Sequence, residues 1–298
     1  MEKEELDAYK KAGEIVKEAQ ELSKKKLKVG TNLFEFAEEI EKAIKKKGGF
    51  PAFPINLSVN NVAAHYTPGF ESEDILEEDA IIKIDIGVHV DGFICDTAET
   101  IDFSGKQTEM VNAAKEALEA AVKLVKEKTE LGTIGEKIQK TIKGKGFNPI
   151  QNLSGHGVQQ YDAHTYPTIP NIANNDAKVL EDEMAIAIEP FATNGQGFVR
   201  EGSQAEIFQM EEKKPLRGRE ARKIIDFIEE EYSTLPFAER WIQRDLEMSE
   251  FSRKIGLREL MQKKCIGAFP LLKEDEGKIV TQAETTLLLN EGKVIRLY

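Results

Sequence analysis

A sequence pattern that occurs twice limits the folds open to this chain more than any other feature does. Each copy contains a Gly-Thr turn, a short apolar-periodic helix, a Gly-Phe pair and the tripeptide Asn-Leu-Ser. The copies span 29–58 and 131–154, and longer helix patterns precede them at 7–28 and 110–128. The repeat predicts two similar halves with a binding site where they meet.

Strand patterns follow both copies of the repeat. Alternating or continuous apolar residues, bounded by turn signals, mark each strand. The predicted strand pairs are 80–90 with 93–103, 184–191 with 197–209, and 278–289 with 293–298. Each half is therefore expected to consist of two helices followed by strands.

The first predicted hairpin brings two carboxylates together. Asp91–Gly92 is its two-residue turn, so Asp96 is expected to lie opposite Gly87. Asp85 is then a diagonal neighbour of Asp96 on the same face, with Cα atoms roughly 7–8 Å apart. Two cations about 3.5–4 Å apart fit between such carboxylates, and Gly87 is expected to leave that space open. The alternative is a salt-bridged or solvent-facing acidic pair; His89, near the turn, is expected at the surface.

Three further segments carry residue types that bind divalent cations. His156 lies between two glycines, Glu189 ends an apolar run before Pro190, and Glu284 precedes the apolar Leu287–Leu289. An unpaired buried carboxylate is costly, and nearby cations remove that cost. Carboxylates with one imidazole suit two divalent cations that activate a water molecule, which indicates a hydrolase. The alternatives are a structural histidine and strand-end carboxylates in water.

Two more histidines are candidates for catalysis. His65 lies in a turn-rich segment after the first copy of the repeat, and His164 comes eight residues after His156. An imidazole can exchange protons with a substrate amide or stabilise a developing oxyanion near neutral pH. The alternative for each is a hydrogen-bonded structural histidine.

Residues 213–264 contain three helical stretches between strand regions, which predicts an inserted helical subdomain. Its arginines also suit a helix-turn-helix reader of nucleic acid, but interleaved acidic residues favour a solvated face. The net charge of −12 argues against general nucleic-acid binding. No stretch approaches the roughly 20 apolar residues of a membrane span, and Cys95 and Cys265 are expected to be reduced. A cytoplasmic protein is therefore predicted.

The motifs together resemble those of type II methionine aminopeptidases, in the short form typical of archaea. The matching segments are NNVAAHYTP, DIGVHVDGFICDTAET, NLSGHGVQQYDAHTYPTIPN, AIEPF and TQAETTLLL. The resemblance covers essentially the whole chain. It implies an α/β (α+β) fold of the pseudo-twofold "pita-bread" type, with a curved, mainly antiparallel sheet covered by helices. It also implies one catalytic domain over 1–298, with a helical insertion at about 200–270.

The resemblance implies a role for each candidate residue. Asp85 binds one metal, Asp96 and Glu284 bridge the two metals, and His156 and Glu189 complete the shell of the second. Glu189 is also the expected base for the bridging water, while His65 and His164 contact the scissile amide or the tetrahedral intermediate. Phe53, Phe191 and Phe269 are candidates for an apolar pocket that receives the methionine side chain; ordinary core packing is their alternative.

The implied substrate is the initiator methionine of nascent chains with a small second residue. Cobalt, manganese, iron and zinc all support activity in this family. A monomer is the usual form, and docking to the ribosome fits an enzyme of nascent chains. Two alternatives keep the fold: a binding module for ribosomes or nucleic acid that has lost its ligands, and an X-Pro peptidase or creatine-type hydrolase. Neither membrane binding nor sequence-specific nucleic-acid binding is expected.

Overall fold

A computed structural model describes residues 1–298. Its helices are α1 (Lys3–Lys26), α2 (Leu33–Lys46), α3 (Thr108–Val122), α4 (Leu131–Gly144), α5 (Arg219–Glu231), α6 (Glu239–Asp245) and α7 (Glu250–Gln262). The strands of the first half are β1 (Phe50–Pro51), β2 (Asn56–Val59), β3 (Val62–Ala64), β4 (Ile81–Val90) and β5 (Phe93–Asp102). The later strands are β6 (Asn148–Pro149), β7 (Ser154–Gln159), β8 (Asp162–Pro170), β9 (Met184–Ile188), β10 (Phe191–Thr193), β11 (Arg200–Glu201), β12 (Ile207–Met210), β13 (Phe237–Ala238), β14 (Ile266–Phe269), β15 (Leu272–Lys273), β16 (Val280–Gln282), β17 (Thr285–Asn290) and β18 (Lys293–Arg296). None of the helices is both long and apolar enough to cross a membrane.

The repeat in the sequence is a repeat in the structure. Helices α1 and α2 lead into β1 and β2, and helices α3 and α4 lead into β6 and β7. In the first half, β4 pairs with β1, β2 and β5. In the second half, β9 and β10 together take the place of β4: they pair with β7 and β6 on one side and with β17 and β16 on the other. All these pairs are antiparallel, so the prediction of two similar halves is confirmed. The predicted pairing of 184–191 with 197–209 is wrong, because the strands within 197–209 pair with β13, β14 and β15 instead.

The hairpin of β4 and β5 has the predicted register. Val90 pairs with Phe93, and Gly87 pairs with Asp96. Alternation fixes this register, because a slip of one residue would move every side chain of a strand to the opposite face. Asp85 and Asp96 therefore lie on one face, as diagonal neighbours.

The two halves meet where β5 runs beside β16 and β17. The Thr286 hydroxyl accepts a hydrogen bond from the Asp96 amide and donates one to the Asp96 carbonyl, each at 2.8 Å. The Glu284 amide donates to the Ala98 carbonyl at 2.9 Å. The Thr286 hydroxyl thus supplies hydrogen bonds between β5 and β17 in place of backbone-to-backbone bonds. This seam places Asp96 beside Glu284, although 188 residues separate them in the chain (284 minus 96).

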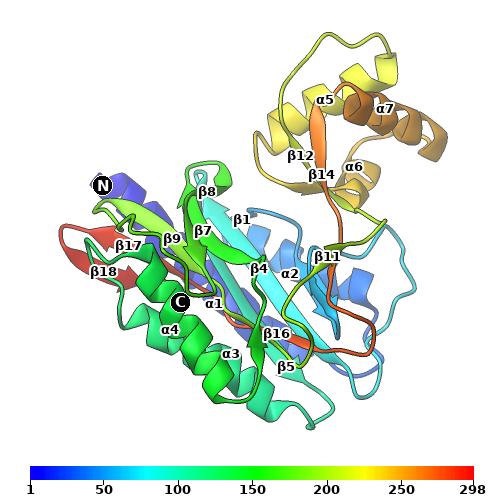
Figure 1. Ribbon diagram of the computed structural model, residues 1–298. Coiled ribbons are helices and arrows are strands. Elements are labelled where there is room, and N and C mark those ends of the chain that lie inside the picture. The colour runs from blue at the N-terminus through cyan, green and yellow to red at the C-terminus, as the bar shows by residue number, and fades with distance from the viewer.

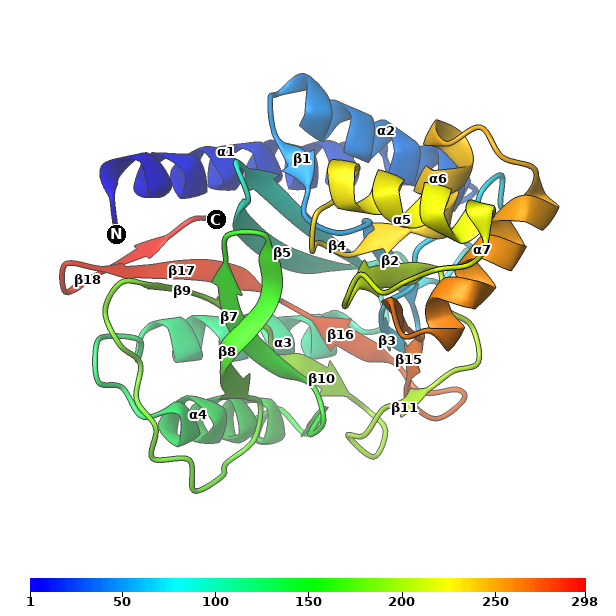
Figure 2. The same ribbon diagram turned by 90° about the horizontal axis from the view of Figure 1, so that it is seen from above.

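Helices cover the strands of each half on the outside. Helix α1 packs on β4 and β5, where its buried Ala12, Ile15 and Val16 join the apolar side chains of β4 in one core. Helices α3 and α4 share a second core with β9, β10 and β17. Figure 2 shows α1 and α2 along one side of the strands and α3 and α4 along the other. The cores leave the concave inner face of the strands for the site.

The segment from β12 to β14 forms a body of its own above the other strands in the view of Figure 1. Helices α5, α6 and α7 pack with the short sheet β13-β12-β14 around a core of their own, which includes Ile224, Phe237 and Trp241. The predicted boundaries of a single domain with an insertion stay a prediction. After β14 the chain leaves this body and enters β15, which pairs with β3 and β11.

Two details of the first hairpin differ from the sequence-based expectation. Gly87 does not leave open space, because a Cβ built there would lie 2.2 Å from Cε1 of Phe53. The glycine therefore lets an aromatic ring lie against the strand, between the acidic residues and the hairpin turn. His89 is half-buried instead of exposed at the surface. Its ring stacks on that of Phe50 at 5.7 Å, and its Nδ1 accepts a hydrogen bond from the Gly92 amide.

Candidate metal and active site

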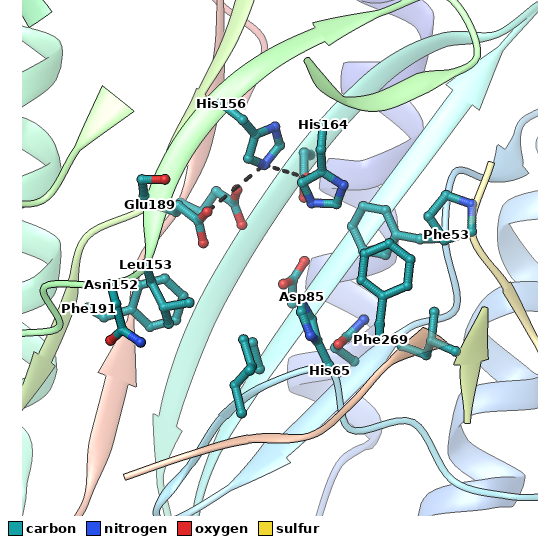
Figure 3. A pocket seen from close by; sticks show the side chains of 18 residues that line it. Phe53, His65, Asp85, Asn152, Leu153, His156, His164, Glu189, Phe191 and Phe269 are labelled. Atoms are coloured by element: carbon teal, nitrogen blue, oxygen red, sulfur yellow. Dashed lines mark ion pairs between the residues drawn. The ribbon is translucent and has the colours of Figure 1, made fainter. Parts of the chain in front are cut away.

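One pocket on the inner face of the strands contains all ten candidate residues. They are Phe53, His65, Asp85, Asp96, His156, His164, Glu189, Phe191, Phe269 and Glu284. They come from both halves of the repeat, and Phe269 comes from β14 at the edge of the helical body. In Figure 3 the labelled histidines and acids surround a common space, with Phe53 and Phe269 on one side and Phe191 on the other.

Asp96, His156 and Glu284 form a buried group that can hold a metal ion. Each offers a ligand atom, and these atoms lie within 4.8 Å of one another. Nδ1 of His156 contacts the Gly157 carbonyl oxygen at 3.2 Å, so Nδ1 carries the proton and Nε2 presents its lone pair. Nε2 points at Asp96 Oδ2, 3.8 Å away, and at Glu189 Oε1, 4.0 Å away (Figure 3). A histidine held through one nitrogen by a backbone carbonyl is typical of metal ligands.

Four carboxylates lie together here without a cation from the chain to neutralise them. Burial raises the pKa of Asp85 to about 7. Burial, followed by the charges of neighbouring carboxylates, raises the pKa values of Asp96, Glu189 and Glu284 well above their ordinary range. Oδ1 of Asp85 and Oδ1 of Asp96 are buried and have no hydrogen-bond partner. Divalent cations would satisfy both the unpaired oxygens and the negative charge, so the residues fit a metal site.

Gln282 is a site residue that the sequence-based prediction missed. Its Nε2 donates to Glu284 Oε2 at 3.3 Å and approaches Glu189 Oε2 at 3.5 Å. A neutral amide thus holds two of the acids without adding charge. The signal for it was present, because Gln282 precedes Glu284 by two residues in an extended segment and so shares its face.

Metal binding to this pocket is expected to release protons and to weaken steeply below pH 7. A cation must displace the protons that the raised pKa of Asp85, about 7, and those of its acidic neighbours retain. The imidazole is not their source, since burial lowers the pKa of His156 to about 4. We expect the apparent Kd for Mn²⁺ to weaken about tenfold or more per pH unit below 7, since one proton displaced corresponds to tenfold per unit. Calorimetric titrations in two buffers of different ionisation enthalpy measure both quantities; a Kd that is constant from pH 6 to 7 would contradict the expectation.

His65 and His164 line the same pocket, with His164 beside His156 and His65 beside Phe269. Nδ1 of His65 contacts the Pro270 carbonyl oxygen at 3.2 Å, so Nδ1 is the donor and Nε2 is free. Its φ of 67° lies in the left-handed region, where side chains other than glycine are strained. The ring centroid of His164 is 4.4 Å from that of His156. Burial lowers the pKa of both His65 and His164, so both are neutral near pH 7.

Aromatic and aliphatic side chains complete the pocket. The ring of Phe269 packs edge-on to that of His65, with centroids 5.4 Å apart. Phe53 lies against Gly87, as described above, and is 7% exposed, whereas Phe191 is fully buried. Phe191 therefore also belongs to the core around Ile150 and Val199, so both readings of this residue, pocket and core, describe it. The apolar part of the pocket thus adjoins the acidic part directly.

The model of metallopeptidase family M24 matches residues 7–213, which is more than half of the chain. The chain belongs to metallopeptidase family M24. A methionine aminopeptidase of Methanocaldococcus jannaschii is similar at 40% identity over 293 residues, covering 97% of this chain and 98% of the relative. This M24 chain therefore has the family relationship that its motifs predicted.

Solved structures of low sequence identity share the fold of this M24 chain. A thermophilic Arx1 has a TM-score of 0.87 at 18% identity, covering 100% of this chain and 91% of the other. A methionine aminopeptidase of Thermotoga maritima has a TM-score of 0.71 at 23% identity, covering 100% and 97%. The predicted pita-bread α/β fold is confirmed. Membership of a metallopeptidase family, together with the buried Asp, His and Glu group, supports the use of a divalent metal.

Proposed function

We propose that this chain is a methionine aminopeptidase that removes the N-terminal methionine from proteins and peptides with a small second residue. One observation carries the proposal: five side chains of types that can bind metal, two neutral histidines and an apolar wall line the same pocket. Relatives named methionine aminopeptidase, which match nearly the whole chain, support it. We propose two divalent cations per chain, of cobalt, manganese, iron or zinc, because four carboxylates are more than one cation needs.

The proposed roles divide the acidic residues between two cation positions. Asp85 would hold one cation, Asp96 and Glu284 would lie between the two, and His156 and Glu189 would hold the other. A pair of divalent cations lowers the pKa of a bound water to near neutrality and stabilises negative charge on oxygen. Glu189 is the proposed base, because its carboxylate lies in the pocket beside His156 and a carboxylate can accept a proton from an activated water.

His65 and His164 are the proposed contacts of the substrate amide. Because both imidazoles are neutral, each can donate one N–H to an oxygen that gains charge and accept a proton with the other nitrogen. His65 presents Nε2 to the pocket, since its Nδ1 is engaged by Pro270. The strained backbone of His65 supports this assignment, because such strain is typical of functional sites.

The methionine side chain is proposed to lie among Phe53, Phe191 and Phe269. Moving this side chain from water into the pocket is favourable by about 1.5–3 kcal/mol of free energy. Contacts between its sulfur and the aromatic rings add to the binding. We propose that residues of about 200–270 are an insertion in a single catalytic domain. Phe269, from this insertion, forms part of the pocket wall. A wall beside the scissile bond would exclude bulky second residues by steric contact.

The proposal includes a monomer that acts on nascent chains, with the ribosome as a partner. A single chain supplies every pocket residue, so a second copy is not needed to complete the site. The binding-module alternative requires lost ligands, but all five positions carry residues that can bind metal.

The deciding experiment is metal reconstitution followed by a panel of peptides. Metal-free protein loaded with Co²⁺, Mn²⁺, Fe²⁺ or Zn²⁺ is expected to cleave Met-Ala-Ser, to cleave a Met-Leu peptide much less, and to leave Xaa-Pro peptides intact. Chelator-treated protein is the control and is expected to be inactive. Preference for Xaa-Pro would favour the X-Pro peptidase alternative. Tight metal binding without cleavage of any peptide, or no metal binding at all, would favour the binding-module alternative.

A further inference from the structure

A buried lysine lies beneath the pocket, outside the set of residues that the proposed function uses. The side chain of Lys83 is 1% exposed. Its Nζ donates to the carbonyl oxygen of Asn60 at 3.0 Å and to that of Val280 at 2.9 Å. Its Nζ forms no ion pair with a carboxylate, and desolvation by burial lowers its pKa to about 7. A buried ammonium without an acidic partner is costly, so its retention calls for a physical reason.

The two carbonyl groups belong to segments that lead into the pocket. Asn60 forms the turn between β2 and β3, and the chain reaches His65 five residues later. Val280 begins β16, which leads to Glu284 four residues later. Lys83 itself is on β4, two residues before Asp85. One ammonium therefore joins three segments that end at three different parts of the pocket.

Other hydrogen bonds at this junction join only pairs of segments. The Asn60 carbonyl also accepts from the Val280 amide at 3.0 Å, and the Asn60 amide donates to the Ile81 carbonyl at 2.8 Å. Only the Lys83 side chain reaches from β4 to both carbonyls at once. Val280 lies in the second half of the repeat and Asn60 in the first, so the ammonium also crosses the seam between the halves.

We propose that Lys83 is a positioning residue, which acts through the metal-binding and histidine side chains and does not touch the substrate. Its ammonium fixes the separation of the strand that carries Asp85, the turn that leads to His65 and the strand that leads to Glu284. Ammonium donors suit this task because they point in three directions from one atom, and carbonyl oxygens accept them without a compensating acid in the site. The inference rests on the proposed function for its activity readout only; cation affinity tests it independently.

The test compares Lys83→Met with a control variant of similar thermal stability. Methionine keeps an unbranched apolar stem but removes all three donors. Leu118→Ala, in the α3 core, is the control for a general loss of stability. For Lys83→Met we expect the affinity for Mn²⁺ to fall about 10- to 100-fold, as for partners that orient metal ligands. We expect kcat for Met-Ala-Ser to fall on a similar scale with little change in KM, because the aromatic pocket is not tied to this ammonium.

Cation affinity and kcat equal to those of Leu118→Ala would overturn the proposal. If Lys83→Met does not fold, Lys83→Gln replaces it. The glutamine side chain is one bond shorter and cannot reach both carbonyl oxygens, so the same comparison decides. If the wild-type protein cleaves no peptide, the proposed function fails. The Mn²⁺ titration of the Lys83 variants then still supports or overturns the positioning role.

Discussion

Glu284→Gln is expected to lower the cleavage of Met-Ala-Ser more than about 100-fold while the chain stays folded. Replacing partners that only orient metal ligands costs about 10- to 100-fold, so replacing a ligand shared by two cations should cost more. Glutamine has nearly the same shape, but it offers one oxygen instead of two and carries no charge. Peptide cleavage and metal content of the loaded variant measure the effect.

The same variant makes a second, opposite prediction for metal-free protein. Burial, followed by the negative charges of Asp96, Asp85 and Glu189, raises the pKa of Glu284 well above its ordinary range. Near pH 7, Glu284 must either stay charged beside these acids or take up a proton on folding, and both cost free energy. Glutamine avoids this cost, so metal-free Glu284→Gln is expected to melt at a higher temperature than metal-free wild type. A lower melting temperature would assign Glu284 a structural role instead.

His65→Ala is the matched control for this prediction. The imidazole lies in the same pocket but outside the buried group of Asp96, His156 and Glu284, which could hold a metal ion. Its loss is expected to lower turnover with Mn²⁺ affinity unchanged, whereas Glu284→Gln should lower both. Full activity of Glu284→Gln would refute its place between the cations, and loss of metal from His65→Ala would make that residue a ligand.

Local sequence signals predicted the parts of the site that neighbouring residues determine. The Asp91–Gly92 turn and the alternation of β4 were sufficient for the register that pairs Gly87 with Asp96. The repeat predicted that the two halves meet, and the seam between β5 and β17 brings Asp96 to Glu284. These predictions succeeded because a period of two and a short turn leave few alternatives.

Polar residues with distant partners could not be predicted in the same way. Alternation along β4 puts Lys83 on the same face as Asp85, but it does not reveal the carbonyl partner Val280, which is 197 residues away. Arg240 was grouped with the arginines of a solvated helical face, yet its side chain is fully buried and pairs with Glu41, 199 residues away. Long-range hydrogen bonds of this kind decide whether a charged side chain can be buried, and local sequence patterns carry no information about them.

Arg240 is the centre of a buried network that attaches the helical body to the pocket. Its guanidinium on α6 pairs with Glu41 on α2 and donates to the Thr67 hydroxyl at 2.6 Å. Thr67 in turn donates to the Ile55 carbonyl at 2.8 Å, and the Ile55 amide donates to Glu41 at 3.1 Å. Trp241 donates to the same carboxylate at 2.7 Å. The network therefore holds the segment between Phe53 and Asn56, both of which line the pocket.

Arg240→Met is expected to lower the free energy of unfolding by about 3–5 kcal/mol, because it leaves a buried carboxylate without its counter-charge. Burial raises the pKa of Glu41 even beside the arginine, so without Arg240 the folded variant should hold a proton on Glu41. Because the unfolded chain releases this proton more readily, the free energy of unfolding of the variant should fall further as pH rises. Urea unfolding at pH 6 and 8 measures both effects. Arg244→Met is the control, since Arg244 is more exposed and pairs with Glu38 and Asp245 at the surface.

The control should cost about 0–1 kcal/mol, as is usual for surface ion pairs. The double variant Arg240→Met with Glu41→Leu should regain part of the loss, because no buried charge is then left unpaired. If Arg240→Met is as stable as Arg244→Met, water takes the place of the arginine beside Glu41 in the variant. If the double variant instead loses as much as the sum of the two single variants, Glu41 acts mainly through its bonds to Ile55 and Trp241, independently of the arginine.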